Sequence, residues 1–110
     1  MTHRYEFAVF AQDLINEYLP GTGWVFAFDG ARKRGGCCHG GWRVITMSRR
    51  LIPLWSDEQN MQVLLHEIAH AIAFERGVYA AGARPHGREW RDLARSIGYT
   101  GQRCHSNPTL

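Results

Sequence analysis

LLHEIAHAIAF, at residues 64–74, is the stretch that decides the fold, because only His66, Glu67 and His70 in it are polar. In a helix, at about 100° per residue, its leucines and isoleucines gather on one side. The two histidines lie on the other side, about 40° apart and roughly 6 Å from each other along the axis. Two imidazoles at that spacing face one point, as a tetrahedral metal ion requires.

An alternative for the same stretch is a buried helix whose histidines hydrogen-bond to their neighbours, and a lone histidine would favour it. The HExxH pattern has two histidines at i and i+4 with a glutamate after the first. It favours a zinc site in which Glu67 is the general base. Three ionisable groups in an apolar helix also cost free energy unless a partner satisfies them. We therefore expect His66 and His70 to bind one catalytic Zn²⁺ ion.

The helix that carries this pattern is predicted to span residues 57–76. Ser56 and Gln59 fit a capping box at its start, where the side chain of each residue satisfies a backbone N–H of the other. Gly77 follows the last turn, where a left-handed residue is favoured. Both ends of the metal-binding helix are therefore marked in the sequence.

The elements on either side of this helix predict an α+β fold. Apolar residues at helical spacing predict a first helix, and Pro85 and Gly98 bound a last one. Two runs rich in aromatic and β-branched residues predict strands, which we expect to pair antiparallel across a glycine-rich connection. These predicted elements are a helix at residues 5–18, strands at 24–28 and 42–47, and a helix at 86–97.

A catalytic zinc needs a third protein ligand, which leaves the fourth position open for water. The candidates downstream are His86, Glu89, Asp92 and His105. In the predicted last helix, His86 falls on the side of Trp90 and Ile97, which packs inward, and this favours His86. Glu89 stays open as a competitor, because a carboxylate is the third ligand in thermolysin-like sites.

Length and composition indicate one small globular domain over residues 1–110. Hydrophobic residues make up 45% of the chain and charged residues 21%, which is ordinary for a globular protein. The N-terminal residues lack the pattern of a signal peptide, and no apolar run approaches the roughly 18 residues of a membrane span. Three cysteines are a poor basis for a disulfide framework. We therefore expect a reduced, cytoplasmic protein without a membrane partner, whose oligomeric state the sequence leaves open.

The net charge of +3 comes almost wholly from arginine, which suits contacts to phosphate and carboxylate groups. Four arginines, at positions 84, 88, 91 and 95, fall on one helical stripe, opposite Trp90 and Ile97. A solvated helix face is the ordinary explanation of such a stripe. DNA is the alternative partner, and the residues predicted to contact it are Arg32, Lys33, Arg34, Arg88, Arg91 and Arg95.

Two further groups of residues have both an ordinary and a functional interpretation. A second, structural zinc site would use Cys37, Cys38, His39, Cys104 and His105. These residues contain no CxxC pair, so ordinary, partly buried thiols are favoured. Aromatic residues that fit a core better than a substrate platform are Trp24, Phe26, Trp42, Trp55 and Trp90.

LLHEIAHAIAFERG at residues 64–77 and HGREWRDLARSIG at 86–98 together resemble the SprT-like zinc metallopeptidases, which include Spartan. The segments at 24–29, 31–34 and 43–48 are similar to that family's first strand, basic turn and second strand, so the resemblance covers roughly residues 5–99. It implies that His66, His70 and His86 bind zinc and that Glu67 is the general base. It also implies a small zincin-like domain, with a β-hairpin or short sheet beside the metal helix and the third ligand on the last helix.

Many members of that family carry a C-terminal zinc ribbon or DNA-binding extension, and the family is linked to DNA–protein crosslinks. The sequence ends at Leu110, so we expect a minimal form without the ribbon. For the same reason, the link to crosslinks is the implication that transfers least directly.

The function predicted from these observations is zinc-dependent hydrolysis of peptide bonds in protein substrates, including DNA-associated proteins. One alternative is a DNA-associated binding module with a structural or vestigial zinc. Glu67 argues against this, since a purely structural site does not need a base. Another alternative is a zinc hydrolase acting on a non-protein amide. Candidate donors to the oxyanion, among which the sequence does not choose, are Tyr79, Arg84, Tyr99 and His105.

Overall fold

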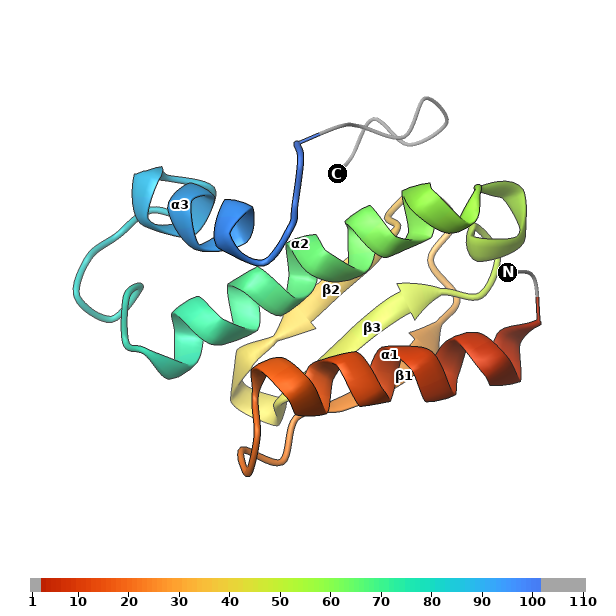
Figure 1. The fold of residues 1–110 in the computed structure, drawn as a ribbon, viewed down its shortest axis with the longest axis horizontal. Helices are drawn as coiled ribbons and strands as arrows, with labels where there is room; N and C mark the ends of the chain where they lie inside the picture. Colours follow the sequence, from red (N-terminus) through yellow and green to blue (C-terminus); the bar gives the residue numbers. More distant parts are fainter. Residues whose placement is uncertain (1–2, 102–110) are drawn as a thin grey trace.

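Between residues 3 and 101, the part of the chain described by this computed structural model, the fold consists of three helices and a three-stranded mixed sheet (Figure 1). The prediction of an α+β fold is therefore confirmed. The elements in chain order are α1 (Arg4–Tyr18), β1 (Val25–Asp29), β2 (Gly36–His39), β3 (Val44–Ser48), α2 (Asp57–Glu75) and α3 (Arg88–Ser96), with short 3₁₀ turns at Gly40–Trp42 and Ile52–Leu54.

The sheet has the strand order β1-β3-β2, which differs from the predicted pairing. β1 runs parallel to β3, with Val25 opposite Val44, so the prediction that these two runs pair antiparallel was wrong. The strand antiparallel to β3 is β2, where Cys38 lies opposite Ile45. Because β2 brings the chain back along the sheet, β1 and β3 can run in the same direction. Its four residues lie inside the stretch that was expected to be only a connection.

The core lies between one face of the sheet and the two longer helices. Ile45 and Met47, which alternate along β3 and therefore share a face, are fully buried in one cluster with residues of α1 and α2. Ile15 of α1 and Ile68 of α2 are also fully buried in that cluster. In Figure 1 α3 lies on the side of α2 away from the sheet. α2 is thus held between the sheet and α3, which is why so much of it is buried.

Three of the four predicted core tryptophans are buried, and one is not. Trp24, Trp55 and Trp90 are buried, whereas Trp42 is 85% exposed. Trp42 ends the 3₁₀ turn between β2 and β3, so its side chain is carried out of the sheet. The prediction from aromatic character alone was therefore wrong for Trp42. The turn directs its side chain away from the core, although burial of an aromatic ring is favourable.

The start of α3 is also different from the prediction. The helix begins at Arg88, with Gly87 as its N-cap, and does not include His86. His86 has a φ of 63°, and the N–H of Gly87 donates to the carbonyl of Arg84 at 2.9 Å. Residues 84–87 thus form a β-turn in which Pro85 takes the second position and His86 the third. Pro85 initiates this turn and is not the first residue of the helix.

No helix within residues 3–101 combines the length and the apolar character that crossing a membrane requires.

Replacing Ser56 by Ala should destabilise the protein by about 1 kcal/mol, because α2 would lose its N-terminal cap. The Ser56 hydroxyl accepts from the N–H of Gln59 at 3.1 Å, and the Gln59 side chain accepts from the N–H of Ser56 at 2.8 Å. Urea unfolding followed by circular dichroism measures the change. Ser56→Thr keeps the hydroxyl and should unfold close to the wild-type midpoint. Equal losses in both variants would show that the cap does not stabilise α2.

Candidate metal centre

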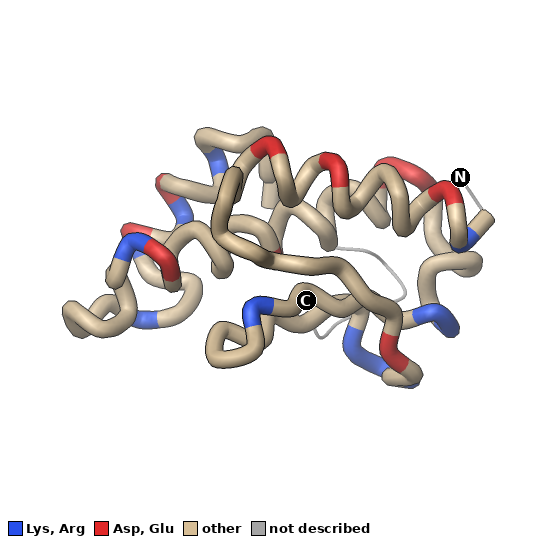
Figure 2. Tube along the Cα trace, turned by 90° about the horizontal axis from the view of Figure 1, so that it is seen from below, with Lys and Arg blue, Asp and Glu red and all other residues tan. Residues whose placement is uncertain are grey.

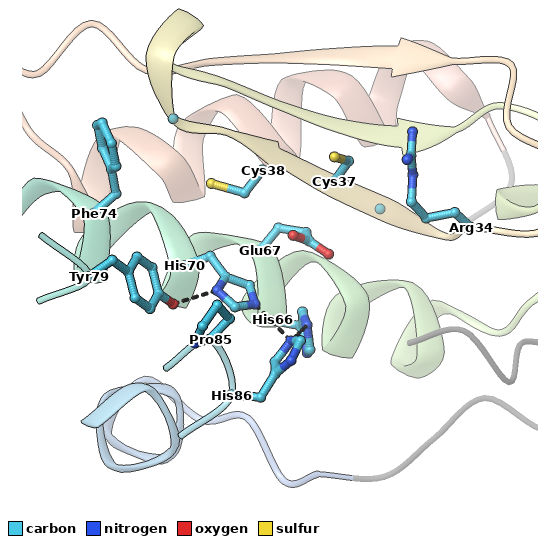
Figure 3. Close-up of a pocket in the computed structure, with 12 residues that line it drawn as sticks. Arg34, Cys37, Cys38, His66, Glu67, His70, Phe74, Tyr79, Pro85 and His86 are labelled. Atoms are coloured by element: carbon cyan, nitrogen blue, oxygen red, sulfur yellow. Dashed lines mark hydrogen bonds between the residues drawn. The ribbon is translucent and has the colours of Figure 1, made fainter. Parts of the chain in front are cut away.

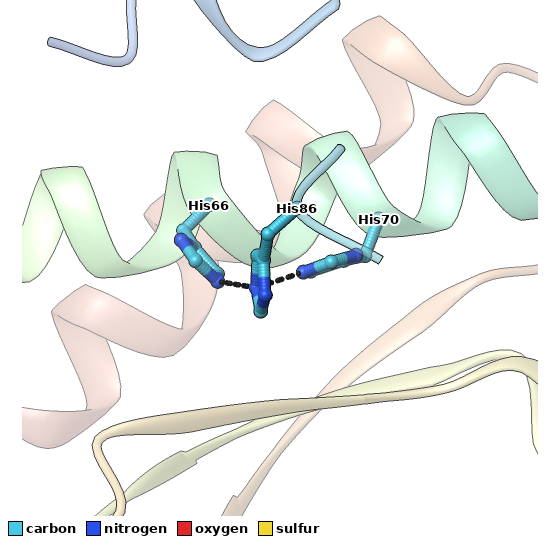
Figure 4. A group of neighbouring side chains, drawn as sticks. All are labelled: His66, His70 and His86. Atoms are coloured by element: carbon cyan, nitrogen blue, oxygen red, sulfur yellow. Dashed lines mark hydrogen bonds between the residues drawn. The ribbon is translucent and has the colours of Figure 1, made fainter. Parts of the chain in front are cut away.

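Three imidazole rings converge between α2 and the turn before α3 (Figure 4). The Nε2 atom of His86 lies 2.9 Å from Nε2 of His70 and 3.1 Å from Nε2 of His66. The metal-ligating atoms of these three residues all lie within 4.8 Å of one another. Two of them come from successive turns of one helix, and the third comes from a segment 16 residues beyond His70.

The chemistry of these nitrogens fits a bound cation. A neutral imidazole has one N–H and one lone pair, so the lone pair of His86 Nε2 can accept from only one neighbour. Its two close contacts therefore cannot both be good hydrogen bonds among neutral rings. A Zn²⁺ ion with Zn–N distances of about 2.0–2.1 Å accepts a lone pair from each ring and satisfies all three. His66, His70 and His86 could thus hold a metal ion.

His86 reaches this point because of the turn that precedes α3. A positive φ is uncommon outside glycine and costs free energy, and it tends to persist only where the surrounding structure fixes it. Gly87 supports the same turn, since a Cβ at this position would lie 2.9 Å from the backbone oxygen of Arg84. The left-handed residue and the tight glycine together aim the His86 ring at α2.

The other candidate third ligands are not part of this cluster. Glu89 and Asp92 are both exposed, and Asp92 lies 3.9 Å from Arg88 as an i,i+4 ion pair. Among residues 3–101, the three histidines are the group that could hold a metal. His105 lies outside the described residues. The structure thus brings His86, and not Glu89, to the two helix histidines, although the helix used to predict this does not contain His86.

Each helix histidine has a tyrosine hydroxyl at its other ring nitrogen. The hydroxyl of Tyr79 lies 2.6 Å from Nδ1 of His70, and that of Tyr99 lies 3.4 Å from Nδ1 of His66. If Nε2 gives its lone pair to a metal, Nδ1 carries the proton and donates to the phenol oxygen. Both tyrosines were predicted only as oxyanion donors, and a hydroxyl that accepts from Nδ1 still has its own proton to donate.

Trp90 packs against all three histidine rings. Its ring centroid lies 4.7 Å from that of His66, 4.9 Å from that of His70 and 4.8 Å from that of His86. The contact with His70 is stacked, at an interplanar angle of 22°. Trp90 was predicted as core and is 4% exposed, but its contacts also fix the orientation of the three rings. In the sequence, the only indication of this second role was that Trp90 follows His86 by four residues.

Burial keeps the helix histidines neutral. Together with the nearby imidazoles, which contribute less, it lowers the pKa of His66 to about 4 and that of His70 to about 3. Burial also lowers the pKa of His86. All three rings therefore offer lone pairs at neutral pH, which is the protonation state that metal binding needs.

Glu67 is enclosed between α2 and β2. It is 5% exposed, and burial raises the pKa of its carboxyl to about 8, while the charge of Arg34 acts in the opposite direction. Gly36 of β2 lets the strand approach, since a Cβ there would lie 3.0 Å from Cγ of Glu67 and 3.1 Å from a Val63 methyl. A raised pKa brings the carboxyl close to the range of an effective general base.

A cavity of about 380 Å³ opens in front of these groups (Figure 3). Glu67 projects from α2 toward β2 inside it, with Arg34 near one end and Phe74 and Tyr79 at the other (Figure 3). The three histidines also line this cavity. A ligand that enters it therefore contacts both the histidine cluster and the carboxyl group.

The cysteines on β2 line the same cavity and do not form a second metal group with other described residues. Sγ of Cys37 lies 4.0 Å from Nδ1 of His39. Burial raises the pKa of Cys38 to about 12, so its thiol stays protonated at neutral pH. Within residues 3–101 the metal-ligand grouping comprises only the three histidines. Cys104 and His105, needed for the predicted second zinc site, lie outside the described residues.

Comparison with known protein families matches the SprT-like family over residues 2–109, which is essentially the whole chain. No curated protein and no solved structure matches the chain. The family match confirms the resemblance seen in the histidine motifs.

Replacing Tyr79 by Phe should weaken zinc binding about 10- to 100-fold, because His70 would lose the acceptor that fixes its ring. Competition with a chromogenic chelator measures the affinity. Tyr5 is 72% exposed on α1, so Tyr5→Phe is the matched control and should bind zinc as wild type does. An unchanged affinity in Tyr79→Phe would show that the 2.6 Å contact does not support the metal centre.

Zinc affinity should stay nearly constant as the pH is lowered through 6.5, the ordinary pKa of histidine. Protons and metal compete for the same nitrogens, and lowered pKa values leave few protons to displace. The affinity should fall only when the pH approaches the lowered pKa values of the three rings. The same chelator competition, repeated across pH and corrected for the chelator's own titration, tests this. A fall of about tenfold or more per pH unit that begins at 6.5 would contradict it.

Proposed function

Because the chain belongs to the SprT-like family, we propose that it is a zinc-dependent metallopeptidase of the zincin type that hydrolyses peptide bonds in protein substrates. The observation that carries this proposal is the joint placement of the histidine cluster and Glu67 in one open cavity. A structural zinc is usually closed by four protein ligands, whereas three ligands leave a position for water. His66, His70 and His86 are the proposed ligands and Glu67 is the proposed general base.

The reaction assigned to these residues is amide hydrolysis. When bound, a zinc ion lowers the pKa of the attacking water and polarises the scissile carbonyl. Glu67 accepts the proton of the attacking water and later delivers it to the nitrogen of the leaving amine. Its enclosure by β2 keeps the carboxyl directed into the cavity, and a nearby cation would lower its pKa from about 8 toward neutrality.

Tyr79 is the proposed donor to the developing oxyanion. Its side chain lines the cavity, and its hydroxyl can accept from His70 while directing its own proton into that space. Burial raises the pKa of Tyr79 to about 12, so the phenol keeps this proton at neutral pH. Arg84 is exposed and does not line the cavity, which makes it a weaker candidate.

The two alternative functions differ from this proposal in the role that they give to the cavity. A DNA-associated binding module would have no use for an enclosed carboxyl beside the histidines. A hydrolase of a non-protein amide would use the same groups, so only the substrate separates it from a peptidase. DNA as a partner stays a prediction. Figure 2 shows Lys and Arg at several separated places along the chain, interspersed with Asp and Glu.

Replacing Glu67 by Gln should abolish hydrolysis and retain zinc, since the amide keeps the shape of the side chain but cannot accept the proton. We expect at least a 100-fold loss in the cleavage of an unfolded protein substrate, as general-base catalysis contributes about 10²–10⁴-fold. Gel analysis of cleavage and measurement of bound zinc on the same samples test both parts.

The matched control is Glu58→Gln, the same substitution at an exposed position in the first turn of α2. Glu58 does not line the cavity, and its carboxylate accepts from the Gln62 side chain at 3.5 Å. This control should keep measurable hydrolysis. Wild-type activity in Glu67→Gln would refute the proposed role of Glu67. A wild-type protein that binds zinc but cleaves no protein substrate would favour the alternative functions.

A further inference from the structure

Two of the three clustered histidines, His66 and His86, also line a second hollow of about 330 Å³ on the α3 side. The other described residues that line this hollow include Arg91 and Arg95 of α3 and Tyr99 and Thr100 of the segment that follows. The first cavity and this hollow therefore share His66 and His86 as a common boundary. A substrate bound across the cluster would extend into both.

The second hollow is basic. Arg91 and Arg95 are one turn apart on α3, so their side chains project from the same face. Both are exposed, and neither forms a salt bridge with an acidic residue in the described part of the chain. Arg88, which precedes them on the helix, is by contrast 3.9 Å from the carboxylate of Asp92. The described walls of the hollow include no acidic residue.

The first cavity is apolar at the end opposite Arg34. There its walls include Phe74, Tyr79 and Pro85, which offer apolar surface (Figure 3). The histidine cluster thus adjoins apolar walls at this end of the first cavity, whose other end carries Arg34, and two arginines in the second hollow. This asymmetry would select among peptides by the charge of the group that enters the second hollow.

From this geometry we infer that the second hollow is a subsite for a carboxylate of the peptide substrate, bound by Arg91 and Arg95 next to the scissile bond. The inference rests on the proposed peptidase function and adds a substrate class to it. Guanidinium groups bind carboxylates through charge-assisted, often bidentate hydrogen bonds, which favour an acidic peptide over its amide counterpart. The carboxylate comes either from a Glu or Asp side chain or from the C-terminus of the chain being cleaved.

A peptide carboxylate fits the second hollow better than a nucleic-acid strand. Strand binding needs a groove that follows several phosphates, together with aromatic faces on which bases stack. The hollow is small, presents two guanidinium groups and adjoins the histidines. Its two aromatic residues are engaged within the protein. Trp90 is 4% exposed and packs on the three imidazoles, and the Tyr99 ring packs edge-on against His66 and Trp90.

The test uses the zinc-loaded full chain carrying Glu67→Gln, so that bound peptides are not consumed. Degenerate heptapeptides, synthesised with free and with amidated C-termini, are equilibrated across a dialysis membrane and identified by mass spectrometry. Peptides with Glu should be enriched on the order of tenfold over their Gln counterparts. Enrichment in the amidated set assigns the carboxylate to a side chain, and enrichment confined to the free set assigns it to the C-terminus.

Charge reversal separates recognition from a folding defect. Arg91→Glu combined with Arg95→Glu should abolish the preference for Glu and produce one for Lys, which a merely unstable variant would not do. Arg88→Gln on the same helix is the matched control and should keep the wild-type selectivity. Equal retention of Glu and Gln peptides together with equal retention of free and amidated peptides, or no retained peptide at all, would overturn the subsite.

Two further measurements keep the subsite distinct from the proposed function and from nucleic acid. A wild type that cleaves no protein while Glu67→Gln still enriches acidic peptides would refute the peptidase but not the carboxylate site. Cleavage without any acidic preference would refute only the subsite. Fluorescence anisotropy with a single-stranded oligonucleotide completes the test. If the double charge reversal abolishes oligonucleotide binding and leaves peptide selectivity unchanged, the two arginines serve nucleic acid and the inference fails.

Discussion

The convergence of three imidazole nitrogens on one point is the constraint on which the rest of the structure depends. His66 and His70 need one continuous helix, which places residues four positions apart on the same face. His86 needs a turn that holds a non-glycine residue at a φ of 63°. Trp90 joins the two parts, because its ring contacts all three imidazoles and anchors α3 against α2. Packing and site geometry are therefore set by the same contacts.

Enclosure sets the electrostatics of the site. The histidines stay neutral because burial disfavours their charged form, and the same effect raises the pKa of Glu67. Gly36 makes this enclosure possible, since β2 could not approach Glu67 so closely with a larger residue. A metal ion would stabilise this arrangement, because it binds the neutral rings and favours the ionised carboxylate. In its absence, the buried carboxyl costs stability as the pH rises from 4.5 toward about 8, where the unfolded chain is ionised and the folded one is not.

Predictions from local sequence patterns were accurate for features that depend on a single helix. The capping box at Ser56 and the left-handed residue at Gly77 both occur as predicted, and α1 begins within one residue of its expected start. The sheet was not predictable in the same way. β2 has four residues, bounded by glycine pairs and without clear alternation, so its sequence indicates a connection. Only pairing with β3 makes it a strand, and that pairing in turn makes β1 and β3 parallel.

By itself, the sequence determined that two histidines and a glutamate lie on one helix, because helical periodicity fixes residues i and i+4 relative to each other. It also contained the family resemblance in its two histidine motifs, and the match over residues 2–109 confirms it. Only the tertiary structure decided how His86 reaches the cluster, that Tyr79 and Tyr99 lie at the outer ring nitrogens, and that Arg91 and Arg95 border the site. These contacts join residues at least nine positions apart or on different elements. Their geometry depends on how α3 and its preceding turn pack on α2, which no local pattern specifies.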